Sequence, residues 1–243
     1  MKTFKDIIFS VFNINQLLLI VLISLSTKVY TQINTSDIGS WTMLFNQTKI
    51  HDKWSIHSEI QFRSYDIQPN TEQLLLRAGI NYHYSSNVIF TGGYGWINNY
   101  KDDGEIFKNQ TVNENRLWEQ LILKNNIGRV FIEQRYRIEQ RWMEQNQITN
   151  YKNRIRHLFR INIPINKKEI AKNILFISLY NEVFIHINNT PFDRNRLYGA
   201  IGFQLNSKTS IQVGYMIQTA GNTSKQYLQL GINYNPDLRK KEK

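Results

Sequence analysis

The chain has 243 residues, enough for one large all-β domain or two small ones. Hydrophobic residues make up 41% of it and aromatic residues 13%, which excludes a disordered tail. It contains no cysteine, which excludes disulfides, thiolate metal sites and cysteine nucleophiles. The formal net charge is +11, but the arginines sit at alternate strand positions and the one dense basic run is at residues 239–243, so we expect no nucleic-acid binding.

The first predicted element is an N-terminal export signal. Lys2 and Lys5 supply positive charge, and residues 17–25 form a short core rich in leucine and isoleucine. Small residues that could precede a cleavage site follow at about residues 26–32. A membrane-spanning helix needs about 20 apolar residues, roughly twice the length of this core. The pattern therefore favours a signal peptide over residues 1–31, with an uncleaved anchor as the alternative.

Beyond this signal, apolar and polar side chains alternate in segments of about ten residues. Successive side chains of a strand point to opposite faces, so a period of two predicts β-structure. Residues 130–142 show it well, with charges on one face and Val, Ile, Tyr and Trp on the other. We predict one domain over residues 32–235, followed by a charged tail over 236–243. The expected strands lie near residues 41–49, 54–65, 73–84, 88–100, 114–125, 129–142, 151–164, 174–186, 195–205, 209–219 and 226–235.

The predicted connections fall into a short and a long class that alternate along the chain. The short ones are residues 50–53, 85–87, 125–128 and 206–208, and the longer polar ones are 66–72, 101–113, 143–150, 187–194 and 220–225. Outer-membrane barrels alternate in this way, with short periplasmic turns and longer external loops. The fold class we predict is all-β, a single antiparallel up-and-down transmembrane β-barrel. Because single-chain bacterial barrels have an even number of strands, we expect ten to twelve strands and favour twelve.

Tryptophan and tyrosine residues gather near the predicted strand ends. These rings prefer the headgroup region of a bilayer, so a barrel carries two aromatic belts about a bilayer apart. The expected membrane-interface aromatics are Trp54, Tyr82, Tyr84 and Tyr234 near the short turns, and Trp41, Tyr94, Trp96 and Trp142 near the long loops.

The polar faces of the strands carry arginine and glutamate. In a lipid-embedded barrel these faces must point into the lumen, whereas in a soluble β-sandwich they could face solvent. The predicted lumenal charge network consists of Glu59, Arg63, Arg77, Glu133, Arg135, Arg137, Glu139, Arg141, Arg154, Arg156, Arg160, Glu182 and Arg196. It has nine arginines against four glutamates, a surplus of five positive charges. Such a network either closes the lumen by salt bridges or lines a narrow pore that favours anions.

An outer-membrane lipid-modifying enzyme, a hydrolase or an acyltransferase, is a different function class. None of the five histidines stands in a nucleophile-elbow context such as G-x-S-x-G. Ser178, Glu182 and His186 share one face, but a spacing of four residues in a strand separates neighbours by roughly 13 Å. They cannot form a triad by themselves. We expect no catalytic site, no metal site and no cofactor.

Several motifs resemble a known family. Arg-Tyr-Arg-Ile-Glu-Gln-Arg-Trp at 135–142 and Tyr-Asn-Glu-Val-Phe at 180–184 are the most distinctive, and shorter matches run from Trp54 to Met216 in the same order. These segments resemble the domain-of-unknown-function 2490 family of outer-membrane β-barrels, found mostly in Bacteroidetes. The resemblance implies an exported barrel and no established activity.

Export and the barrel pattern together predict the outer membrane of a Gram-negative cell. The expected partners are outer-membrane lipid and lipopolysaccharide, and the barrel-assembly machinery during insertion. A soluble secreted β-protein is the alternative, and the oligomeric state stays open.

Overall fold

The computed structural model describes residues 38–167, 172–187 and 191–239. The predicted signal peptide, residues 1–31, lies outside the described residues, and so does the end of the predicted charged tail. Within the described ranges, no helix is long and apolar enough to cross a membrane.

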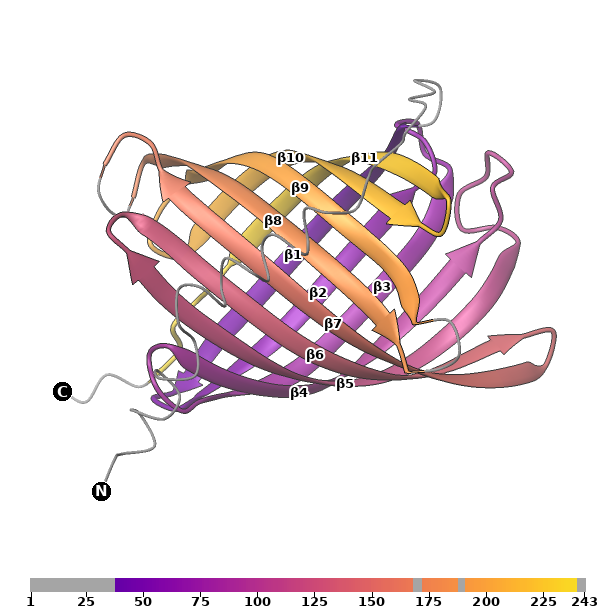
Figure 1. Ribbon diagram of the computed structural model, residues 1–243, viewed down its shortest axis with the longest axis horizontal. Coiled ribbons are helices and arrows are strands. Elements are labelled where there is room, and N and C mark those ends of the chain that lie inside the picture. The colour runs from indigo at the N-terminus through magenta and orange to yellow at the C-terminus, as the bar shows by residue number, and fades with distance from the viewer. Residues whose placement is uncertain (1–37, 168–171, 188–190, 240–243) are drawn as a thin grey trace. The chain divides into compact units, whose positions relative to one another are not determined.

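Eleven strands in the described part of the chain form one closed barrel (Figure 1). Each strand pairs antiparallel with the next one along the chain, and β1 and β11 close the wall as a parallel pair. The strands are β1 (Ile38–His51), β2 (Trp54–Ser64), β3 (Thr71–His83), β4 (Val88–Tyr100), β5 (Gln110–Ile127), β6 (Val130–Gln145), β7 (Ile148–Pro164), β8 (Ile174–His186), β9 (Phe192–Gln204), β10 (Thr209–Ala220) and β11 (Thr223–Tyr234).

The predicted all-β barrel is confirmed, and its strand number falls within the expected ten to twelve, one below the favoured twelve. Hairpins reverse the chain at every turn, so an odd number of strands leaves the first and last running in the same direction. Ile38 to Asn46 therefore pair in parallel with Gln226 to Tyr234. The chain after β11 continues this contact, because Lys49 N donates to the carbonyl of Pro236 over 2.8 Å.

The strand register places charged side chains inside the barrel and apolar ones outside. In β6, Arg137 and Glu139 are buried, whereas Ile138 between them is exposed. Similar exposed aliphatic side chains, such as Ile80, occupy the outer face of other strands. Buried polar and charged residues outnumber buried hydrophobic ones among the described residues. The wall is therefore polar inside and apolar outside, the reverse of a soluble β-sandwich.

Inward-facing glycines make room for large rings on neighbouring strands. Trp118 on β5 is fully buried and lies across Gly93 of β4 and Gly79 of β3. A Cβ built on Gly93 would stand 2.5 Å from the Trp118 Cζ2 atom and would also collide with the carbonyl oxygen of Ala78. The same arrangement recurs at the pairs Gly39 with Tyr227, Gly202 with Phe176 and Gly214 with Tyr198. The flat rings thereby fill space next to the wall that a pleated strand would leave empty.

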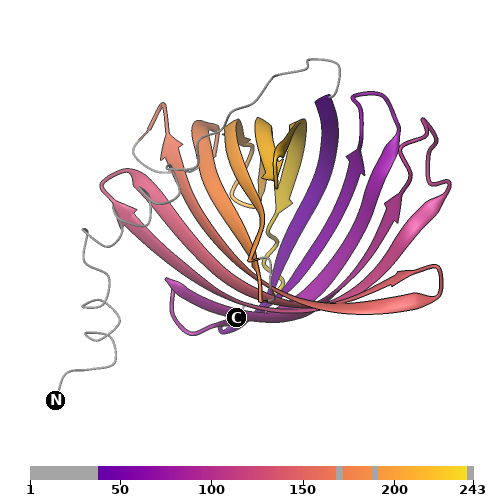
Figure 2. The ribbon, with the colours of Figure 1, turned by 45° about the vertical axis from the view of Figure 1, so that its right-hand side comes forward.

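The connections at the two ends differ from the prediction in two places. Residues 143–150 and 220–225 are not long loops, because strand pairing continues to tight two-residue turns. Asn146 and Gln147 join β6 to β7 with φ of 51° and 64°, and Gly221, at φ 57°, begins the turn from β10 to β11. Two consecutive positive φ angles are what a tight hairpin needs. Residues 143–150 are polar in composition and were predicted as a loop, but they extend β6 and β7. The extended hairpin projects beyond the neighbouring strands at the lower right of Figure 2.

We predict that Gly93→Ala destabilises the barrel by about 1–3 kcal/mol, because the new methyl group must displace Trp118 or the backbone of β3. Thermal or denaturant unfolding of the purified barrel measures the change. Gly95→Ala is the matched control on the same face of the same strand, since its Cβ would meet nothing nearer than Ile97 Cδ1 at 3.5 Å. Equal midpoints for the two variants would contradict the proposed packing of Trp118.

Candidate functional site

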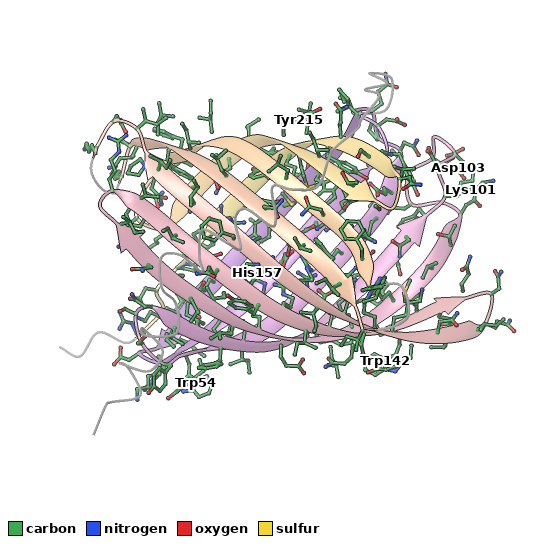
Figure 3. The ribbon with its side chains drawn as sticks, viewed as in Figure 1. Trp54, Lys101, Asp103, Trp142, His157 and Tyr215 are labelled. Carbon is green, nitrogen blue, oxygen red and sulfur yellow. The ribbon has the colours of Figure 1, made fainter. Side chains whose placement is uncertain are left out.

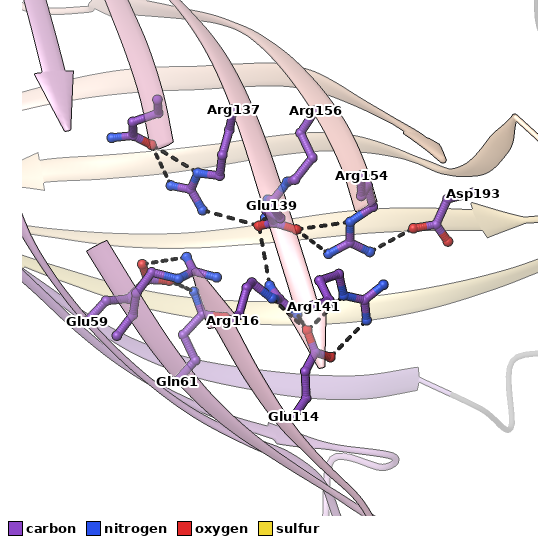
Figure 4. Close-up of polar contacts among 12 residues, drawn as sticks. Glu59, Gln61, Glu114, Arg116, Arg137, Glu139, Arg141, Arg154, Arg156 and Asp193 are labelled. Carbon is purple, nitrogen blue, oxygen red and sulfur yellow. Dashed lines mark hydrogen bonds and ion pairs between the residues drawn. The ribbon is translucent and has the colours of Figure 1, made fainter. Parts of the chain in front are cut away.

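Glu139 stands at the centre of the charged interior and binds four arginines (Figure 4). Its carboxylate is 2.6 Å from Arg154 Nη2, 2.7 Å from Arg156 Nη1, 3.3 Å from Arg116 Nη1 and 3.8 Å from Arg137 Nη1. The exposed fraction of Glu139 is 0%. The register explains the convergence, because Arg154 of β7 is its direct partner and Arg156 faces Arg137 one pair further along the same inner wall.

Glu182 on β8 extends this cluster toward the β9 side of the lumen. Its Oε1 atom accepts hydrogen bonds from Arg156 and from Arg135, each over 2.7 Å. Arg196 lies 3.7 Å from the other oxygen. Arg156 therefore bridges Glu139 and Glu182, and the two carboxylates belong to one continuous network.

Two acidic residues that the sequence analysis did not assign complete the network. Glu114 on β5 accepts from Arg116 over 2.6 Å and from Arg141 over 2.7 Å, and it is almost fully buried. Its strand alternates Glu114, Arg116, Trp118 and Gln120, a period of two that could have identified it. Asp193 reaches Arg154 over 2.7 Å beside a register shift between β8 and β9. Such an irregularity re-aims a side chain, and a simple alternation rule does not include it.

Glu59 anchors a second cluster on the β2–β3 wall. Arg77 Nη1 donates to it over 2.9 Å, Gln61 donates to its other oxygen, and His57 Nε2 lies 3.3 Å away. Arg63 Nε donates to Gln61 Oε1 over 3.0 Å. The remaining residues of the predicted network, Glu133 and Arg160, form a looser pair at 3.6 Å and are more exposed.

The predicted interface role of Trp41 is wrong. Trp41 points into the lumen with an exposed fraction of 3%, and its ring lies 3.8 Å from the Arg63 guanidinium and 4.8 Å from that of Arg196. β1 carries large apolar residues on both faces, so its sequence did not reveal which face is inside. Trp54, Tyr84, Tyr94, Trp142 and Tyr234 are exposed, and Tyr82 and Trp96 are half-buried. Trp54 and Trp142 project from opposite ends of the barrel in Figure 3.

A cavity of about 650 Å³ runs along the lumen between these charged side chains. Eleven arginines and Lys124 line it, against five glutamates. Glu139 and Asp193, which pair with lining arginines, bring the carboxylates to seven. Twelve cations against seven anions leave a surplus of five positive charges among the described residues of the lumen.

Neither a metal centre nor a catalytic triad is apparent in the described part of the chain. No group of three or more His, Asp or Glu side chains there could hold a metal ion. Ser178 Oγ has no hydrogen-bond partner, and His186 pairs instead with Asp193 at 3.7 Å. Ser55 Oγ lies 2.8 Å from His83 Nε2, but Ser55 is fully buried and does not line the cavity.

Comparison with known proteins gives a family match over most of the barrel. The model of the family described as "Protein of unknown function (DUF2490)" matches residues 38–229. An uncharacterized protein of Methylorubrum extorquens strain AM1 is 23% identical over 170 residues, which cover 67% of this chain and 70% of that protein. No solved structure matches the chain.

We predict that Glu139→Gln destabilises the barrel by about 3–5 kcal/mol, because it leaves buried guanidinium groups without their shared counter-charge. The unfolding midpoint of the purified protein measures the loss. Glu105→Gln is the matched control, since the exposed Glu105 side chain pairs with the exposed Lys108 and the change should alter stability by about 0.5 kcal/mol or less. An unchanged midpoint for Glu139→Gln would show that the network does not depend on its charge.

Proposed function

This chain belongs to the DUF2490 family of proteins of unknown function, and we propose that it is an exported, non-enzymatic outer-membrane β-barrel whose lumen is closed by the Arg/Glu network. The observation that carries the proposal is the inverted wall, with apolar side chains outside and paired charges inside. Water solvates the apolar outer face poorly, whereas lipid can cover that face while salt bridges pair the charges inside.

The dimensions of the strands support a place in a bilayer. The strands range from 11 residues in β2 to 18 in β5, and a tilted transmembrane strand needs about 9–11 residues. Exposed aromatic residues stand at both ends, with Trp54 near the short turns and Trp142 near the other end. In this proposal the outer wall contacts lipid and lipopolysaccharide, and the barrel-assembly machinery inserts the chain.

Burial of the network supports a closed lumen rather than an open pore. Glu139 and Arg137 have exposed fractions of 0% and 2%, so neighbouring side chains cover almost all of both groups. Arginine side chains also stack on rings inside the wall, as Arg137 does on Trp118 at 4.6 Å. The surplus of positive charge favours the second candidate, a narrow anion-favouring pore, if the side chains leave a continuous water path.

We predict that the protein fractionates with the outer membrane of a Gram-negative host and migrates faster on a gel before boiling than after it. Both results follow from a closed barrel in lipid, because hydrogen bonding around the whole wall resists detergent. A periplasmic or secreted product without heat-modifiable migration would instead support the soluble alternative.

We predict no discrete conductance steps when the purified barrel is reconstituted into planar bilayers, because the paired Arg and Glu side chains interrupt the water path through the lumen. Discrete steps with a reversal potential that favours anions would overturn the closed lumen and support the narrow pore. Incubation with phospholipid and lipopolysaccharide addresses the non-enzymatic part of the proposal, since release or transfer of acyl chains would contradict it.

A further inference from the structure

Three arginines on the inner face of β6 and β7 stand out from the rest of the network. Arg135 and Arg137 are two residues apart on β6, and Arg160 of β7 pairs in register with Glu133. Arg135 and Arg160 are therefore diagonal neighbours on one face. All three line the lumenal cavity, on the side that leads toward the β5–β6 turn.

The hydrogen-bonding capacity of this group is not filled by the protein. Arg137 Nη1 is buried without a hydrogen-bond partner, and the Glu139 oxygen that pairs with it lies 3.8 Å away. Arg160 Nε is also buried without a partner, and its ion pair with Glu133 is 3.6 Å long. Buried guanidinium donors left without acceptors cost free energy, so acceptors are expected near them.

The nearby carboxylates are also too few to balance the charge of these three arginines. Glu182 already accepts from Arg135 and Arg156 through one oxygen. Glu139 is closer to Arg154 and Arg156 than to Arg137. Glu133 is the carboxylate that pairs with Arg160, and it is loosely held. Within the described lumen, this group of three arginines therefore has an excess of positive charge.

We propose that Arg135, Arg137 and Arg160 bind a small oxyanion, a phosphate or a carboxylate, in the lumenal cavity. Guanidinium groups match the geometry of these anions through paired N–H donors, which a spherical chloride cannot exploit. The cavity of about 650 Å³ has room for the anion and its remaining water. The Tyr180 ring, 5.3 Å from the Arg160 guanidinium, helps to hold that side chain in place. The site deepens the proposed function and rests on the closed, positively charged lumen.

The test is titration calorimetry on the purified, phosphate-free barrel with sodium phosphate, sodium succinate and sodium chloride at one ionic strength. We expect saturable binding of phosphate or succinate and none of chloride. Comparison of the phosphate and succinate titrations shows whether the site prefers a phosphate or a carboxylate. Arg160→Gln should weaken binding about tenfold, the effect of one charge-assisted hydrogen bond. Glu133→Gln should tighten binding, because it removes the carboxylate that competes for Arg160.

The two variants separate anion binding from a structural role, since a merely structural Glu133 gives no gain in affinity when it is neutralised. Arg239→Gln is the control, because Arg239 pairs with Asp52 and Asp237 outside the lumen. Absence of saturable oxyanion binding, or equal affinities for wild type and Arg160→Gln, would overturn the proposal. Membrane fractionation and heat-modifiable migration of the same proteins report separately on the proposed outer-membrane barrel.

Discussion

The structure depends on the convergence of four arginines on the carboxylate of Glu139. In most domains, apolar side chains fill the interior, but here many of them are on the outside of the wall. The charged groups must therefore compensate one another's desolvation, which succeeds only when geometry is good and the remaining donors are hydrogen-bonded. The network also favours one strand register, because a slip of one residue would turn these charges outward.

Aromatic rings provide the other part of the interior. Trp118 lies over Gly93 and Gly79 and carries the guanidinium groups of Arg77 and Arg137 on its ring. The glycine backbone thus packs against one side of the Trp118 ring, and the two guanidinium groups stack on that ring. Trp41 has a similar role between Arg63 and Arg196. The interior therefore combines electrostatic pairing with stacking, and neither alone accounts for the burial of so many arginines.

Much of this architecture follows from the alternation of residue types. All eleven predicted segments correspond to observed strands, because a period of two is a local property that one sequence displays directly. The predictions that were wrong or incomplete concern features that the alternation of residue types does not determine. The face of Trp41 is set by the register of β1 with its neighbours, since both faces of that strand hold large apolar residues. The turn at Asn146 and Gln147 is set by backbone angles rather than polarity. Glu114 was missed although its strand showed the pattern, and Asp193 depends on a register shift.

The parallel seam between β1 and β11 has a consequence for how the cylinder assembles and comes apart. It joins edges at opposite ends of the folded sequence, so it can form only after the intervening hairpins are in place, when the entropic cost of closing so long a loop has been met. It also has nine register pairs, against twelve between β10 and β11 and fifteen between β5 and β6. Parallel pairing is slightly less stable per residue than antiparallel pairing. We therefore expect β1 and β11 to pair last when the cylinder assembles, and to separate first under heat or force.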